Sequence, residues 1–177
     1  VLMLIPTTVF AATTYAPALS VSAERAENTV VVRVKASAYS DCWGLQLDLS
    51  FPDTKLSVTE DNIVCAGLLE GAQKNVRTDA SGKVIAAAWS GTAARNSETE
   101  ETILTATFSV NEGATGTLPF NISTYVSTNG DDEATALPSG STGTASVVIP
   151  ITDASSISAT VAAPEKGKAL ATAAQAT

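Results

Sequence analysis

The feature of this sequence that most constrains its fold is a run of alternating apolar and polar residues at 45–51. A two-residue period is that of a β-strand with one face buried and the other in water. Pro52 ends the run, since proline has no N–H to give to a strand ladder. The outward positions carry no large side chain, so we expect a flat polar face that a partner can approach closely. The inward set is Leu45, Leu47, Leu49 and Phe51, and the outward set is Gln46, Asp48 and Ser50, with Gly44 before it.

Eight further stretches have the composition of short strands and are separated by turn signals, for example at 79–82 and 113–116. Aromatic residues make up only 5% of the chain, and Thr, Ser, Val and Ala are abundant, which favours short strands over long helices. Nine strands at spacings of about ten residues predict an all-β fold, a nine-stranded antiparallel two-sheet sandwich with jelly-roll topology. The expected strands are 19–23, 29–36, 42–51, 55–59, 75–78, 83–90, 102–110, 117–127 and 144–149.

The two ends of the chain differ in composition from this domain, which we place at 17–150. Residues 1–16 begin with an apolar run that is too short to span a membrane, followed by small residues, as at the end of a secretory signal peptide. Residues 151–177 are rich in Ala, Thr and Ser and have no two-residue period, so we interpret them as a linker or tail. We therefore expect an exported protein, secreted or held at the cell surface.

Charge and residue types argue against several classes of function. The formal net charge is −8 and the pI about 4.4, whereas nucleic-acid binding needs clustered Lys and Arg. The chain has no histidine, which removes the usual general base of serine and cysteine hydrolases and the commonest transition-metal ligand. The acidic residues at 98–101 and 131–133 fall in loops, and the second group lacks the spacing of a calcium loop. We expect neither catalysis nor a cofactor in this chain.

Two cysteines, Cys42 and Cys65, flank the central strand and the strand after it. In an oxidising compartment they could form a disulfide, but successive strands of a sandwich usually belong to different layers. Whether their β-carbons lie within bonding distance does not follow from the sequence. Buried free thiols are the other interpretation, and both stay open.

Three stretches resemble, in their order and spacing, a cohesin domain, the receptor module of bacterial cellulosome scaffold proteins. They are WGLQLDLSFPDTKLSV, SGKVIAAAWS and EETILTATFSVNEGATGTLPFNIS. In that family a strand and turn of the type F-x-L-x-Y-D-x-x-x-L precede a G-x-I hairpin, and L-x-x-x-F-x-V and G-x-x-x-I follow. The resemblance covers residues 19–149. The chain departs from the family at 51–53, where the turn is usually Tyr-Asp-Pro, and at 86–88, where an aromatic-rich strand is reduced to alanines.

The resemblance implies a non-catalytic module that docks a dockerin module, and so assembles enzymes or scaffold subunits into an extracellular polysaccharide-degrading complex. It implies that calcium is held by the dockerin, in two EF-hand-like segments, and that the cohesin itself has no cofactor. The implied binding sheet consists of the third, fifth, sixth and eighth strands. The implied contact residues are Gly44, Gln46 and Asp48 on the third strand, Asn75, Arg77 and Asp79 on the fifth, and Val84, Ala86, Ala88 and Gly91 on the sixth.

The residue pattern agrees with this placement. The heavier residues Ile85 and Trp89 should face the core, which leaves Ala86 and Ala88 outside as a shallow platform against which a helix can lie. Taken without the resemblance, the same positions could be ordinary exposed strand residues. Two other functions stay open: a surface adhesin domain, and a carbohydrate-binding module with the same sandwich. The second needs a row of exposed aromatic rings, and the sequence shows no such row.

Overall fold

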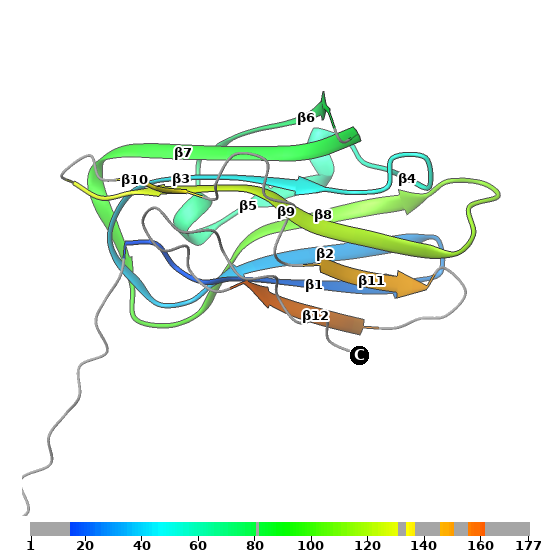
Figure 1. Ribbon diagram of the computed structural model, residues 1–177, viewed down its shortest axis with the longest axis horizontal. Coiled ribbons are helices and arrows are strands. Elements are labelled where there is room, and N and C mark those ends of the chain that lie inside the picture. Colours follow the sequence, from blue (N-terminus) through cyan, green and yellow to red (C-terminus); the bar gives the residue numbers. More distant parts are fainter. Residues whose placement is uncertain (1–14, 81, 131–133, 137–145, 151–155, 162–177) are drawn as a thin grey trace, which may run out of the picture.

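The structure is a computed structural model that describes residues 15–80, 82–130, 134–136, 146–150 and 156–161. These residues form twelve strands and two short 3-10 helices (Figure 1). Nine of the strands have five or more residues, whereas β4, β5 and β10 have two or three. In chain order the elements are β1 Leu19–Ala26, β2 Thr29–Ala36, β3 Tyr39–Ser50, β4 Leu56–Ser57, η1 Glu60–Asn62, β5 Ile63–Cys65, η2 Gly67–Leu69, β6 Gln73–Asp79, β7 Gly82–Ser97, β8 Glu101–Val110, β9 Thr117–Thr128, β10 Ala134–Ala136, β11 Ser146–Pro150 and β12 Ser156–Val161.

The strands form two sheets, and every strand pair in the described residues is antiparallel. The first sheet has the order β12-β1-β2-β8-β4, with β5 also paired to β8. The second has the order β10-β9-β3-β7-β6, with β11 also paired to β9. Figure 1 shows the two layers, with β3 and β7 in one and β1, β2 and β12 in the other. The predicted all-β, two-sheet antiparallel sandwich is confirmed.

The inward residues of the two sheets meet in one apolar core. Alternate residues of β2 are fully buried, as are Leu47 and Leu49 of β3, which is the pattern that the two-residue period predicted. Phe108 of β8 lies beside both Phe51 and Phe120, with ring centroids 5.0 and 5.4 Å away. Because β8 and β9 belong to different sheets, these rings link the two layers.

Several strand boundaries correct the sequence-based expectation. β7 continues to Ser97, where the sequence predicted a polar loop, because Arg95 and Ser97 pair with Cys42 and Tyr39 of β3. The short strand β10 lies in another predicted loop and pairs with β9. β12 lies within the segment interpreted as a linker or tail, and it pairs with β1 over its whole length. The first sheet therefore extends past the predicted domain boundary at residue 150.

The segment before β1 is fastened to β9. The Ser127 hydroxyl donates a hydrogen bond to the Tyr15 carbonyl at 2.8 Å, and the Tyr125 hydroxyl donates one to the Pro17 carbonyl. Ala16 is buried. The predicted boundary between residues 16 and 17 therefore falls within a segment that packs on the domain. The remainder of the predicted leader and residues 162–177 lie outside the described residues.

The two cysteines are both free thiols, so the disulfide that the sequence left open is not formed. Cys42 is fully buried in β3, where its thiol lies 3.6 Å from the Ser127 hydroxyl, and Cys65 of β5 is half-buried. Burial raises the pKa of both thiols, so each is mostly protonated at neutral pH.

We expect a thiol reagent at neutral pH to modify Cys65 first and Cys42 only when the domain unfolds, because accessibility and thiolate fraction together set the rate. Mass spectrometry of the labelled protein measures this order. The Cys65→Ser variant is the control, since it should stay unmodified until denaturant is added. Equal rates for the two cysteines, or no reactive thiol after unfolding, would contradict the assignment.

Candidate binding face

The side of the second sheet that faces away from the core is built by β9, β3, β7 and β6, which lie side by side in that order. They correspond to the eighth, third, sixth and fifth predicted strands, which the resemblance implied as the binding sheet. Cross-strand pairing aligns their outward residues in rows, and we call this surface the outer face. From one end to the other, its rows are Thr128, Gly44 and Ser90; Val126, Gln46, Ala88 and Gln73; Thr124, Asp48, Ala86 and Asn75; and Asn121, Ser50, Val84 and Arg77.

Small residues at the centre of the outer face leave it shallow. Ala88 is exposed and Ala86 half-buried, while their neighbours Ile85 and Ala87 on the same strand are buried in the core. This confirms the predicted alternation of β7. Two adjoining depressions of about 460 and 420 Å³ lie over this region, and Gln46, Gln73 and Ala88 line both. The face therefore offers a low floor surrounded by side-chain amides.

Gly44 is needed at one end of the outer face because neighbouring strands come close to it. A β-carbon at this position would lie 2.7 Å from the Thr128 hydroxyl oxygen and 3.4 Å from the Trp89 carbonyl oxygen. Thr128 and Ser90 are its cross-strand partners. A larger residue would therefore displace the Thr128 side chain and also fill part of the larger depression.

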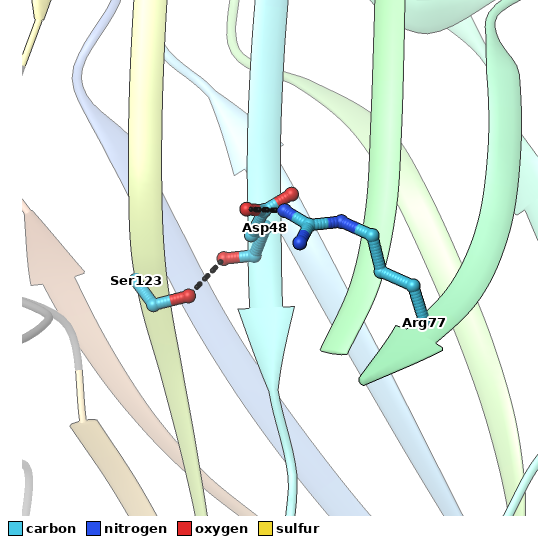
Figure 2. A network of polar contacts seen from close by, with 3 residues as sticks. All are labelled: Asp48, Arg77 and Ser123. Atoms are coloured by element: carbon cyan, nitrogen blue, oxygen red, sulfur yellow. Dashed lines mark hydrogen bonds and ion pairs between the residues drawn. The ribbon is translucent and has the colours of Figure 1, made fainter. Parts of the chain in front are cut away.

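A salt bridge between Asp48 and Arg77 crosses the outer face (Figure 2). Arg77 Nη2 lies 2.5 Å from Asp48 Oδ2, and Figure 2 shows the arginine reaching from β6 to β3. The Asp48 side chain is only 3% exposed, and its second oxygen, Oδ1, is buried without a hydrogen-bond partner. The Ser123 hydroxyl donates a 3.4 Å hydrogen bond to the Asp48 carbonyl. One predicted contact residue is thus covered by another.

The remaining predicted contact residues are placed less favourably for a partner. Val84 belongs to the outer side of β7 but is fully buried, next to Arg77 in the register. Asp79 lies at the turn between β6 and β7, paired with Gly82. A β-carbon on Gly91 would lie 2.6 Å from Trp89 Cζ2, so this glycine makes room for a ring that packs against the core. The structure brings together Gly44, Gln46, Asp48, Asn75, Arg77, Ala86 and Ala88 on the outer face.

The sequence did not predict which residues of β9, or which residues at the edge of the larger depression, contribute to the outer face. Val126 and Thr128 line the larger depression with Ser90, Gln73 and Gly71, none of which was predicted. Leu118 and Phe120 of β9 face the core. If every second residue after them also did so, Val126 would face the core as well. A bulge opposite Asp48 and Leu49 shifts the parity, so that Tyr125 is buried instead.

One rim of the larger depression is held by Arg95. Its guanidinium lies 3.8 Å from the ring centroid of Trp89 and donates hydrogen bonds to the carbonyls of Leu68 and Glu70 at 2.7 and 3.0 Å. These contacts fix η2 and the residues that follow it, including Gly71. Arg95 thereby ties to β7 a segment whose Leu68 and Leu69 are also buried in the core.

The outer face has little net charge. In its four rows only Asp48 and Arg77 are charged, and they pair with each other, although the chain as a whole carries −8. Within the described ranges, no cluster of three or more His, Cys, Asp or Glu residues could hold a metal ion. None of the described elements is a helix with the length and hydropathy required to cross a membrane.

Comparison with known proteins identifies the fold. No protein-family model matches the sequence, and no curated protein does. Solved structures do match. The cohesin of the OlpA complex from Clostridium thermocellum, a type I cohesin–dockerin complex, is 12% identical with a TM-score of 0.50, over 66% of this chain and 89% of that one.

Two further solved structures match with lower TM-scores. The sixth cohesin of scaffoldin B from Acetivibrio cellulolyticus, in complex with a Cel5 dockerin, is 16% identical over 61% of this chain and 81% of that one, with a TM-score of 0.47. The cohesin module of a family 33 glycoside hydrolase from Clostridium perfringens is 8% identical over 66% and 88%, with a TM-score of 0.46. At these identities the similarity concerns the fold alone. The chain has a cohesin-like fold.

Proposed function

We propose that this chain is a non-catalytic module that binds a calcium-loaded dockerin through the outer face, and so assembles enzymes or scaffold subunits into an extracellular polysaccharide-degrading complex. The observation that carries the proposal is the shallow floor of Gly44, Ala86 and Ala88 across adjacent strands, bordered by Gln46, Gln73 and Asn75. The cohesin of the OlpA complex, which has a similar fold, was crystallised with a dockerin.

The chemistry of the face suits a helix. Small floor residues allow a helix backbone to approach closely, so that its side chains enter the two depressions. The side-chain amides of Gln46, Gln73 and Asn75 can each donate and accept hydrogen bonds, so they can satisfy the polar groups of a partner that dehydrates them. The same amides fix the orientation of the docked helix, because a mismatched polar group would be buried without a partner.

The outer face is a poorer surface for a sugar. Carbohydrate sites stack sugar rings on exposed aromatic side chains, and the four rows of the outer face contain none. Trp89 packs against the core and under Arg95, and Trp43 donates its indole N–H to Asp41. Amides and hydroxyls alone supply hydrogen bonds but no stacking surface.

The test is a calorimetric titration of a panel of purified type I and type II dockerins, in calcium, into this chain. The same protein is run over cellulose, starch and xylan columns. We expect at least one dockerin to bind with a stoichiometry of one and no polysaccharide to retain the protein. Retention on a polysaccharide with no dockerin bound would replace this function by the sugar-binding one.

A further inference from the structure

We propose that Arg77 is a specificity-determining residue of the outer face that binds a carboxylate of the partner, and that Asp48 positions Arg77 without touching the partner. The inference rests on the proposed function and assigns one chemical group to the docked module. It changes the role that the resemblance implied for Asp48, from a contact residue to a residue that acts through Arg77.

The burial of Asp48 rules out a direct contact in this arrangement. Its side chain is 3% exposed, and Oδ1 is buried with no hydrogen-bond partner. A buried carboxylate is costly unless a countercharge lies against it. The Arg77 guanidinium provides that countercharge at 2.5 Å. The salt bridge thus holds the arginine in place over β7, between its own strand β6 and the strand β3 that carries Asp48 (Figure 2).

Arg77 is both fixed and accessible. Its side chain is 42% exposed, and Asp48 is the single acceptor recorded for it among the described residues. A guanidinium has five N–H donors in a rigid planar fork, so donors are left for a second acceptor. Because the salt bridge already restricts the side chain, a second bond costs less rotamer entropy than it would for a free surface arginine. A carboxylate matches this fork best.

The charges around Arg77 also favour a carboxylate of the partner at this place. Apart from Asp48 and Arg77 themselves, the outward residues in the rows of Gln46, Asp48 and Arg77 are uncharged, and the next charged residue along this side of β6 is Asp79, at the turn into β7. A lysine or arginine of the partner at this place would meet a guanidinium and find the Asp48 carboxylate already occupied. The chain carries −8, so a broadly acidic partner would be repelled. The face therefore favours one carboxylate at one position in an otherwise neutral contact.

The position of that carboxylate can be estimated from the register. The row of Asp48 is four residues along β3 from Gly44, which lines the larger depression. At about 3.3 Å per residue, the two places are about 13 Å apart. The partner's acid should thus lie about 13 Å from the group that fills the depression beside Gly44.

The experiment is a double-mutant cycle with a dockerin that binds in the titration above. On this chain, Arg77→Gln removes the charge. The matched control is Arg33→Gln, since Arg33 is 41% exposed and paired with Glu24 at 3.4 Å, but lies on β2 of the first sheet. On the dockerin, each exposed Asp or Glu is replaced in turn by Asn or Gln.

We expect Arg77→Gln to weaken binding about tenfold and Arg33→Gln to change it less than twofold. One amide variant of the dockerin should weaken binding by a similar factor with the wild-type chain and by less than twofold with Arg77→Gln. Asp48→Asn combined with Arg77→Gln should bind no worse than Arg77→Gln alone, and it replaces that variant if the lone buried carboxylate prevents folding.

Binding of the Arg77→Gln chain within twofold of wild type would overturn the assignment, as would a loss that couples to no dockerin carboxylate. Both results leave the proposed function standing. A wild-type chain that binds no dockerin would instead remove the proposed function, and this inference with it.

Discussion

Replacement of Ala88 by arginine is expected to weaken dockerin binding by at least a hundredfold, about 3 kcal/mol, while the melting temperature of the free domain stays within a few degrees of wild type. Ala88 is exposed and lines both depressions of the outer face. A long side chain there would occupy the space of the docked helix, and its charge would be buried without a partner. The free domain leaves the same side chain in water, so its stability is spared.

The matched control for this substitution is Ala26→Arg. Ala26 is an exposed alanine at the end of β1, in the sheet that does not form the outer face. Calorimetry and thermal unfolding of both variants separate the two effects. If Ala88→Arg unfolds the domain, the alternation assigned to β7 is wrong. If it binds like wild type, the docking surface lies elsewhere.

The largest loss of stability is expected for Phe108→Ala, about 3–5 kcal/mol. Phe108 is fully buried, and its ring lies between those of Phe51 and Phe120, which links the two sheets. Removing the ring loses buried apolar area and leaves a cavity that both sheets would have to close. Since domains of this kind are stable by about 5–15 kcal/mol, the melting temperature should fall by roughly 10–20 °C.

Ser109→Ala is the control for Phe108→Ala, because Ser109 is the next residue of β8 and is exposed. Its unfolding free energy should stay within about 0.5 kcal/mol of wild type. Denaturant titrations of the two variants give both numbers. The folded fraction of Phe108→Ala should still bind a dockerin, since the outer face is untouched. A loss below 1 kcal/mol would mean that the core does not depend on this ring.

The parts of the fold that follow from the sequence are those governed by a local period. Leu45, Leu47 and Leu49 alternate with polar residues, so the sequence predicts which side of β3 faces the core. All three leucines are buried there in the structure. The same argument correctly placed Ile85 inside and Ala88 outside. In both strands the buried set is so much heavier than the exposed set that only one register is stable.

The parts that do not follow depend on pairing with distant residues. Val126 faces outward only because β9 has a bulge opposite β3, and a bulge has no signal in the period of one strand. β12 has the sequence SISATV, with few large apolar residues, and its place in the sheet comes from its pairing with β1. In each case pairing with a neighbouring strand decides the result, which is the side on which Val126 lies in β9 and the presence of β12 in the first sheet.

The burial of Asp48 and Val84 is a third case of this kind. The two-residue alternation predicts that both lie on the outer side of the sheet, and the strand register agrees with that prediction. Both are nevertheless buried: Arg77, which is 29 residues further along the chain than Asp48, pairs with it across β7, and Val84 is the register partner of Arg77. Sequence spacing gives the side on which a residue lies, but it does not show which long side chain will cover it.

The calcium dependence of binding tests the account most directly. A dockerin of the kind proposed is folded by its own calcium ions, whereas no metal-binding cluster is found in the described part of this chain. Calcium titrated into this chain alone should give no tight uptake. A dockerin titrated into the chain should bind in calcium and lose its binding when a chelator removes the metal, with the circular dichroism of this chain unchanged. Undiminished dockerin binding in chelator, or tight calcium uptake by this chain alone, would contradict the account.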